Sequence, residues 1–171
     1  MSHTYVLDAG VLFSTWTTKV PQGTFVTTAT VLEEVKNRPS QVRADILAIL
    51  DRLHEDIASA DSIAAVKGAA TKTGDISVLS DVDIEIIALA HAKNSVGTDT
   101  TLVSTDLAVL NTARHLGIAI LDPSGKFKHQ IVWGLRCPAC NHRSSSQVKD
   151  LECPVCGTKM KRFVQRKRKS T

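Results

Sequence analysis

Apolar positions along the first part of the chain follow two patterns that alternate with each other. Short apolar or β-branched runs predict buried strands, and longer stretches with apolar residues at helical spacing predict helices. The predicted strands are residues 5–7, 24–28, 102–103 and 118–121, and the predicted helices are residues 31–36, 40–57, 62–71, 80–94 and 107–113. Strands that alternate with helices favour an α/β fold, in which a parallel sheet is covered by helices on both faces.

Residues 40–57 have the apolar period of an amphipathic helix. Charged residues separate its apolar ones, which are Val42, Ile46, Ile49, Leu50, Leu53 and Ile57. Because an apolar stripe of this kind normally faces the core, we expect this helix to be buried along the stripe and to serve a structural role.

Charge and cysteine content divide the chain into two units. Residues 1–125 contain nine Lys and Arg against fifteen Asp and Glu, whereas residues 126–171 contain twelve against two and hold all four cysteines. The run Asp122-Pro123-Ser124-Gly125 has the composition of a turn and stands at the boundary. We therefore predict a first domain at 1–122, a linker at 123–131, a cysteine-containing unit at 132–160 and a basic tail at 161–171.

Acidic residues stand where the predicted strands of the first unit end. Asp8 directly follows the strand at 5–7, and Asp106 lies between the strand at 102–103 and the next helix. Open α/β sheets bind ligands at this carboxyl edge. Asp83, in the first turn of a helix, and Glu34, on an early helix, are further candidates. Converging carboxylates favour hard divalent cations such as Mg²⁺ or Mn²⁺, which support phosphodiester hydrolysis.

Each acid also has a purely structural interpretation. Asp106 can cap the helix that follows it, and Asp8 can stabilise a turn. Ser80 and Asp83 have the spacing of a capping box. Glu34 can lie on a solvated helix face. The pattern of residues alone leaves both interpretations open.

Four cysteines in two C-P-x-C pairs predict a metal site. Cys137 and Cys140 form one pair, Cys153 and Cys156 form the other, and twelve residues separate the pairs. This spacing is typical of a tetrahedral Cys₄ zinc ribbon. Four protein ligands close the zinc to water, so we expect Zn²⁺ to stabilise this unit rather than to catalyse.

Basic residues crowd the end of the sequence beyond what solubility requires. We expect them to bind RNA phosphates, although a solvated tail is the alternative. The candidates are Lys159, Lys161, Arg162, Arg166, Lys167, Arg168 and Lys169. Two aromatic side chains, Trp133 and Phe163, can either stack on bases or pack the core of the small unit.

Four segments of the first unit together resemble the PIN-domain ribonucleases. They are VLDAG, TVLEEVKN, TKTGDISVLSDVDIEIIALA and LVSTDLAVLN. The order TGD followed by LS-x-x-DI-x-x-x-ALA resembles one branch in particular. That branch of PIN endonucleases carries a zinc ribbon and matures the 3′ end of small-subunit ribosomal RNA.

The resemblance implies roles for individual residues. It implies a catalytic set of Asp8, Glu34, Asp83 and Asp106. Glu34 is preferred to Glu33 because the acid of the family directly precedes an apolar-basic pair, here Val35-Lys36. Asp8, Asp83 and Asp106 are implied as ligands of Mg²⁺ or Mn²⁺. Many PIN proteins have a second Asp where this chain has Leu107, which leaves the number of ions open.

The resemblance also implies a reaction and its partners. We expect a metal-dependent endoribonuclease that cleaves precursor 16S-type ribosomal RNA at its 3′ end, on the pre-small ribosomal subunit. The short first unit is similar to archaeal members. The alternatives are a toxin-like PIN ribonuclease acting on messenger or transfer RNA, and a non-catalytic RNA-binding assembly factor.

The sequence predicts no association with a membrane. No apolar run reaches the ~20 residues that a bilayer-spanning helix needs. The residues MSHTYVLDAG at the start of the sequence lack a signal-peptide pattern. We therefore expect a cytoplasmic protein.

Overall fold

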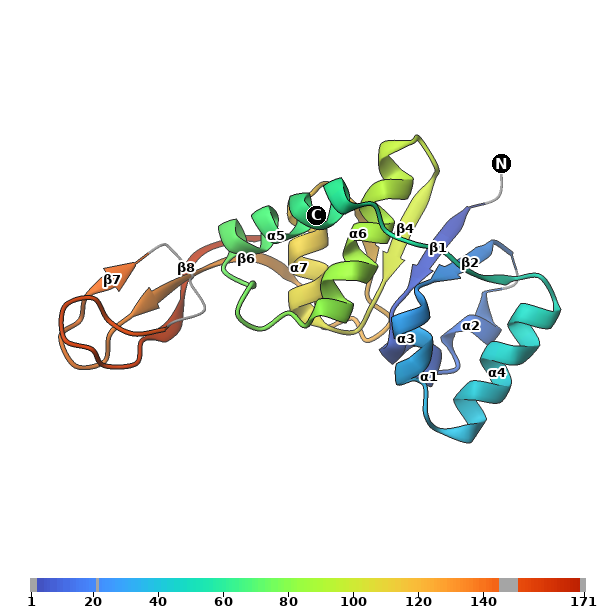
Figure 1. Cartoon of the computed structure of the whole chain (residues 1–171), viewed down its shortest axis with the longest axis horizontal. Coiled ribbons are helices and arrows are strands. Elements are labelled where there is room, and N and C mark those ends of the chain that lie inside the picture. The colour runs from blue at the N-terminus through green and yellow to red at the C-terminus, as the bar shows by residue number, and fades with distance from the viewer. Residues whose placement is uncertain (1–2, 21, 145–150, 170–171) are drawn as a thin grey trace.

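The molecule is elongated, with a sheet-and-helix domain at one end and a small cysteine-containing unit at the other (Figure 1). The computed structural model describes residues 3–20, 22–144 and 151–169. A parallel sheet forms the centre of the first domain, and its five strands lie side by side in the order β3 (Leu53–Glu55), β2 (Thr24–Thr27), β1 (Thr4–Leu7), β4 (Thr100–Val103) and β5 (Ala119–Leu121). Within the described residues, no helix is long and apolar enough to cross a membrane.

Both faces of this sheet are covered. Successive side chains of a strand point to opposite faces. Val6 and Leu7 of β1 are both fully buried, as are Leu102 and Val103 of β4. The α/β class predicted from the alternating pattern is thereby confirmed. Since Leu7 pairs with Val103, β1 and β4 end side by side, and the residues that follow them meet at the carboxyl edge.

The helices of the described chain are α1 (Ala9–Phe13), α2 (Trp16–Lys19), α3 (Ala29–Glu34), α4 (Arg38–Ile49), α5 (Ala60–Thr73), α6 (Asp81–Ser95) and α7 (Leu107–His115). The most deeply buried of the long helices is α6, in which residues 86–90 are all buried. Its apolar residues surround the helix axis, as expected for a helix in the middle of a core. It packs against β1, β4, α5 and α7 and so fixes the sheet relative to its helices.

The prediction of one helix over residues 40–57 is wrong in its second half. Helix α4 ends at Ile49, and Asp51 has a left-handed backbone with φ of 55°. The chain then forms β3, in which Leu53 pairs with Phe25 of β2. The apolar stripe is also not buried as expected, because Ile49 is 82% exposed. Tertiary pairing with β2 therefore overrides the helical period in this segment.

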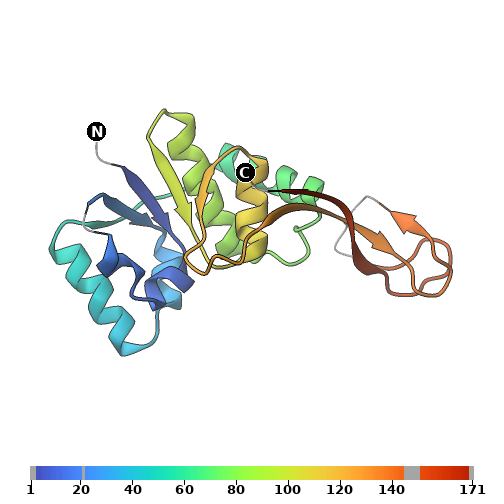
Figure 2. The same ribbon diagram turned by 180° about the vertical axis from the view of Figure 1, so that it is seen from behind.

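The second unit is built on a long antiparallel hairpin. Strand β6 (His129–Arg136) pairs with β8 (Lys161–Lys169) along its whole length, and β7 (Arg143–Ser144) adds a short third strand. Both views show the two long strands running together from the first domain to the cysteine-containing end (Figures 1 and 2). Part of the expected linker thus belongs to β6, and the described part of the expected basic tail is β8, a paired strand.

The hairpin is fixed to the first domain by a polar junction. Asp75 directly follows the left-handed Gly74 at the end of α5 and is 1% exposed. Its carboxylate accepts a hydrogen bond from Arg162 of β8 at 2.7 Å. The side-chain amide of Asn111 of α7 donates to the same carboxylate at 2.6 Å, and it also donates to the carbonyl of Ile131 of β6 and accepts the N–H of Ile131. Burial raises the pKa of the Asp75 carboxyl, and the bonds from Asn111 and Arg162 oppose that rise.

Candidate active site

Ser104 joins two of the predicted acids at the carboxyl edge of the sheet. Its hydroxyl donates a hydrogen bond to Oδ2 of Asp8 at 2.6 Å and accepts one from the backbone N–H of Asp106 at 3.0 Å. Ser104 is fully buried and Asp8 is 8% exposed. Oδ1 of Asp8 also accepts the backbone N–H of Ala9 at 2.7 Å. The carboxylate of Asp8 is therefore held in one position by the residues that end β1 and β4.

Asp106 and Asp83 both cap helices, as the structural interpretation predicts. Oδ1 of Asp106 accepts the N–H groups of Ala108 and Val109 at the start of α7. Ser80 and Asp83 form a capping box, in which Oδ2 of Asp83 accepts the backbone N–H and the hydroxyl of Ser80. Capping does not exclude metal binding. Among the hydrogen bonds between described residues, Oδ2 of Asp106 and Oδ1 of Asp83 are not used.

The negative charges of Asp83 and Asp106 act on the carboxyl of Asp8. The pKa of Asp8 is raised, chiefly because the carboxyl is buried, and the negative charges of Asp83 and Asp106 raise it further. Hydrogen bonds from Ser104 and Ala9 stabilise the ionised form and oppose the rise. A divalent cation between these acids would relieve both costs, because it would neutralise a buried charge and screen the repulsion.

The acids nevertheless stand farther apart than the ligands of a closed metal site. Among the described residues, the four cysteines are the group compact enough to hold an ion as they stand. Oxygen-only sites for Mg²⁺ usually keep several water ligands, so widely spaced carboxylates are compatible with a hydrated ion. The structure thus brings Asp8, Asp83 and Asp106 to one edge without forming a closed cage.

Glu34 is not brought to Asp8 in the same way. It is the last residue of α3 and is exposed, and it does not contribute to the shifted pKa of Asp8. Its neighbourhood contains an acid that the sequence analysis missed, Glu85 of α6, which accepts a hydrogen bond from Thr30 of α3 at 2.5 Å. The signal for Glu85 was its position two residues after Asp83, between the buried Ile84 and Ile86.

Gly10 explains part of the motif around Asp8. A Cβ atom at this position would come within 2.7 Å of the hydroxyl oxygen of Thr105. Helix α1, which Asp8 caps, therefore approaches the turn between β4 and α7 more closely than a larger residue would allow. The short Asp-Ala-Gly sequence permits the close contact between the turns that carry Asp8 and Asp106.

The four cysteine sulfurs form a compact cluster at the far end of the hairpin. The Sγ atoms of Cys137 and Cys156 are 3.5 Å apart, as are those of Cys140 and Cys153, and all four lie within 4.8 Å of one another. Tetrahedral coordination with Zn–S bonds of ~2.3 Å requires sulfurs about 3.8 Å apart. The arrangement fits a zinc ion, and the predicted ribbon is borne out to that extent.

Each cysteine pair lies in a turn of the same design. The N–H of Cys137 donates to the carbonyl of His142, and the N–H of Cys153 donates to the carbonyl of Thr158. A left-handed residue, Asn141 or Gly157, closes each turn. These turns direct the sulfurs inward. The hydrogen bond between the thiol of Cys156 and the hydroxyl of Thr158, more than any other contact, lowers the pKa of Cys156 to about 6.

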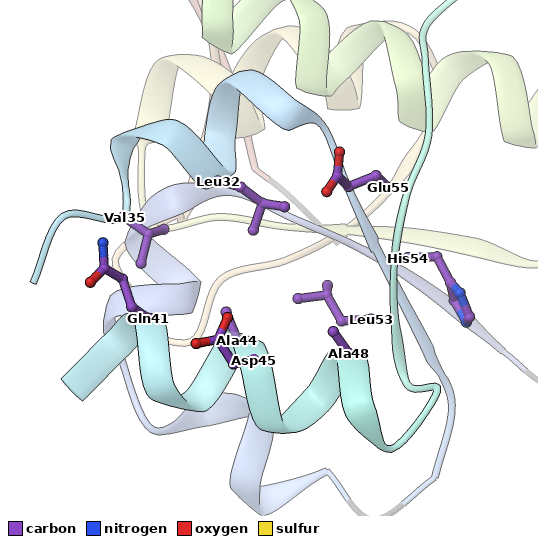
Figure 3. A pocket seen from close by; sticks show the side chains of 9 residues that line it. All are labelled: Leu32, Val35, Gln41, Ala44, Asp45, Ala48, Leu53, His54 and Glu55. Carbon is purple, nitrogen blue, oxygen red and sulfur yellow. The ribbon is translucent and has the colours of Figure 1, made fainter. Parts of the chain in front are cut away.

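A large cavity lies elsewhere on the first domain. It measures about 630 Å³ and is enclosed by α3, α4 and β3. Figure 3 shows Leu32 and Val35 on one side of it, with Ala44 and Ala48 of α4 on the other. None of the four predicted catalytic acids lines it. The size of a cavity therefore does not indicate the candidate site, whose aspartates lie at the carboxyl edge of the sheet.

Comparison with known proteins gives a consistent result. The profile of the family described as "PIN domain of ribonuclease" matches residues 5–92. Endoribonuclease Nob1 of Pyrococcus abyssi is 32% identical over 142 residues, which cover 83% of this chain and 85% of that protein. Endoribonuclease Nob1 of Archaeoglobus fulgidus is 34% identical over 158 residues, or 90% and 87% of the two chains. Ribonuclease VapC1 of Thermoplasma acidophilum is 31% identical over 169 residues, or 97% and 80%.

Proposed function

The chain belongs to the PIN-domain family of ribonucleases, and from that premise we propose that it cleaves precursor small-subunit ribosomal RNA at its 3′ end with the help of Mg²⁺ or Mn²⁺. That it is an endoribonuclease follows from the family. The choice of substrate is our proposal. It is supported by the similarity to the Nob1 endoribonucleases over most of both chains, together with the four-cysteine cluster.

One observation carries the assignment of the active site. Three aspartates approach one edge of the sheet, where burial raises the pKa of Asp8 and the charges of Asp83 and Asp106 raise it further. We assign Asp8, Asp83 and Asp106 as the residues that hold the divalent ion and Glu34 as a further catalytic acid. The ion would supply an ionised water as the nucleophile and would stabilise the departing oxygen.

The protein's own contribution is to fix and orient these acids. Ser104 and the N–H of Ala9 hold Asp8 in place, and the start of α7 holds Asp106. Burial of Asp8 limits access of bulk water on that side of the site.

RNA would also bind to the hairpin and the cysteine unit. The basic residues that the sequence assigned to RNA binding lie on β8 or just before it, on a strand fixed by β6. Ordered cations bind phosphates at a lower entropic cost than cations on a free tail. We propose that Lys159, Lys161, Arg166, Lys167, Arg168 and Lys169 contact RNA phosphates. Arg162, in contrast, is paired with Asp75 and serves first to hold the hairpin.

A second candidate function is supported by one comparison. Ribonuclease VapC1 of Thermoplasma acidophilum aligns with 97% of this chain. A substrate other than ribosomal RNA, such as a messenger or transfer RNA, is the alternative that this similarity favours.

Cleavage assays with the full-length protein distinguish ribosomal RNA from messenger or transfer RNA as the substrate. We expect precursor small-subunit RNA to be cut at one site near the 3′ end in the presence of Mn²⁺, and unrelated messenger or transfer RNA to remain intact. Asp83→Asn should reduce the rate at least ~100-fold, since it removes a negative ligand at the reacting centre. Asp81→Asn is the matched control on the same turn of α6 and should remain active. Equal cleavage of all RNAs would favour the alternative substrate.

A further inference from the structure

A second pocket lies between the first domain and the hairpin, next to the candidate active site. It measures about 530 Å³, within the range of ligand-binding pockets. We call it the hairpin pocket. Its lining residues are contributed by the start of α7, the loop before β6, one face of β6 and β8, and Asp75.

The hairpin pocket shares a wall with the predicted catalytic edge. Leu107 and Ala108, which line it, directly follow Asp106, and the N–H of Ala108 donates to the carboxylate of Asp106 at 2.6 Å. A molecule in the pocket would therefore lie beside the helix start that carries one of the three aspartates. An occupant of this pocket would be adjacent to a phosphodiester held at those acids.

The walls of the pocket combine aromatic and cationic groups. Phe127, Ile131 and Trp133 supply apolar surface, and Lys126 and Lys128 lie on the loop beside them. Lys167 of β8 adds a third ammonium group from the hairpin. In the part of the chain that the structure describes, none of these three lysines forms an ion pair. The one carboxylate of the lining, Asp75, is already paired with Arg162.

The loop that carries Phe127 is held in place before any ligand binds. Asp122 accepts hydrogen bonds from the N–H groups of Ser124 and Phe127, both at 2.8 Å, and from the hydroxyl of Ser124. Trp133 is also held in place, because the guanidinium of Arg162 lies 4.4 Å from the centre of its ring. Rigid aromatic walls reduce the entropy lost on binding.

The two faces of the hairpin differ in what they offer. Alternate residues of a strand point to opposite faces, so Ile131 and Trp133 line the hairpin pocket while Gln130 and Val132 lie on the other face. On that second face, Arg166 and Arg168 border a hollow of about 90 Å³. Basic residues therefore occur on both faces, but among the described residues the aromatic wall occurs on one.

We propose that the hairpin pocket binds one unpaired nucleotide of the RNA substrate, with its base against the aromatic wall and its phosphates at the three ammonium groups. Aromatic side chains beside a cationic groove are the features that bind single-stranded RNA. A base must leave its helix to enter such a pocket, so the site selects unpaired RNA next to the cleaved bond. This inference rests on the proposed ribonuclease function and adds a specificity subsite to it.

The test uses the full-length protein and a single-stranded RNA that contains the cleavage site. One abasic nucleotide is placed at each successive position, and binding is measured without Mn²⁺. We expect one position at which the missing base weakens binding by about tenfold, the effect of losing one stacked base. Phe127→Ala should weaken binding of the intact RNA by a similar factor and should make that position insensitive to base removal.

Three controls separate this role from effects on folding and charge. Phe127→Tyr keeps the ring and should restore sensitivity to the missing base. Phe13→Ala removes an exposed phenyl group of α1, outside the pocket, and should leave that sensitivity intact. Arg168→Ala removes a charge from the other face of the hairpin, so it should weaken all the RNAs equally and preserve the preference at the one position.

The outcomes for the pocket and for the proposed function are independent. If no abasic position weakens binding, or if Phe127→Ala retains the preference of the native protein, the pocket does not bind a base. Cleavage is scored separately with Mn²⁺ on the intact RNA. Failure to cleave would contradict the proposed function, and the binding data would still decide the occupant of the pocket.

Discussion

At the scale of single residues, Ser104 is the link between the acids of the candidate site. Its buried hydroxyl contacts Asp8 and the backbone of Asp106 at once, so the ends of β1 and β4 carry one hydrogen-bonded unit. The sequence predicted that both aspartates would lie at this edge, because each follows an apolar strand. It could not predict their hydrogen bonds, since these depend on the register in which Leu7 pairs with Val103.

The raised pKa of Asp8 predicts how stability depends on pH. The folded state holds this proton more tightly than the unfolded chain, so ionisation of Asp8 reduces the free energy of unfolding as the pH rises above the ordinary value of 3.8. Asp8→Asn should therefore be more stable than the native protein at pH 7 without Mg²⁺ or Mn²⁺. Each kcal/mol of relief should raise Tm by about 3 °C.

Denaturation curves of the zinc-loaded protein between pH 7 and pH 4 measure this difference. The advantage of Asp8→Asn should shrink as the pH falls, because Asp8 takes up a proton in the folded state before it does so in the unfolded chain. Asp61→Asn, an exposed acid in the first turn of α5, provides the control. An Asp8→Asn protein that is less stable at pH 7 would contradict the expected cost of a buried charge.

Asp106 allows capping to be separated from metal binding. Asn caps helices nearly as well as Asp, so Asp106→Asn should retain the start of α7. Mn²⁺ stabilises the folded native protein by ~2.7 kcal/mol at a concentration 100-fold above Kd. If Asp106 is a ligand of the ion, the Asp106→Asn variant should lose most of that stabilisation. Thermal melts of both proteins with and without Mn²⁺ measure it. Equal shifts in the two proteins would show that Asp106 is only a cap.

At the scale of elements, the sequence predicted those whose stability is local and missed those that depend on partners. Helix α6 begins at the capping box of Ser80, a local signal that the sequence contains, so its start was readable. Strand β3 was hidden within an apparent helical period because only pairing with β2 makes Leu53 a strand residue. Strand β8 was assigned to a tail because its charged side chains resemble a solvated segment.

Folding of the cysteine unit should depend on bound zinc. Its small core consists of Leu135, Cys137, Cys153 and Met160, with Leu151 packed against them. That core is too small to stay folded without its metal. Removal of zinc should therefore unfold the residues after about Arg136, whereas the first domain, which has its own core, should remain folded.

Native-state hydrogen exchange with and without a strong chelator measures this difference. Backbone N–H groups of Cys137 and Cys153 should lose protection, and those of α6 should keep it. The N–H of Ile131, which donates to Asn111, serves as an internal marker for the docked end of the hairpin. Unchanged protection at the cysteines would mean that the unit folds without metal.

At the scale of the whole molecule, an acidic domain and a basic hairpin are joined by buried polar contacts. Asp75 lies in the TGD motif by which the family was recognised, and here it anchors Arg162 and Asn111. The sequence signalled that Asp75 belongs to a motif, but it did not indicate the partner, which lies 87 positions away. The division of charge was readable from composition, whereas the geometry that joins the two units was not.

The ordered cations of β8 should dominate the dependence of RNA binding on salt. Each phosphate neutralised on a single strand steepens the log–log slope by ~0.7. Replacing Arg166, Lys167, Arg168 and Lys169 with Gln keeps the strand and should flatten the slope by up to about 3. Deletion of the same residues would also remove the partner of residues 129–132, so substitution is the cleaner experiment. An unchanged slope would place the RNA elsewhere.

The hairpin also gives the molecule a fixed internal length. Strand β6 has eight residues, and at ~3.3 Å per residue it spans about 26 Å between the docked end near α7 and the cysteine turns. Asn111 holds β6 at Ile131, and Asp75 holds β8 at Arg162, which pairs with Leu135, so the hairpin can act as a ruler. Stacked nucleotides spaced ~3.4 Å apart would place about eight positions along that length. If RNA binds at the cysteine unit, the length of the hairpin would therefore determine which phosphodiester bond lies at the aspartates.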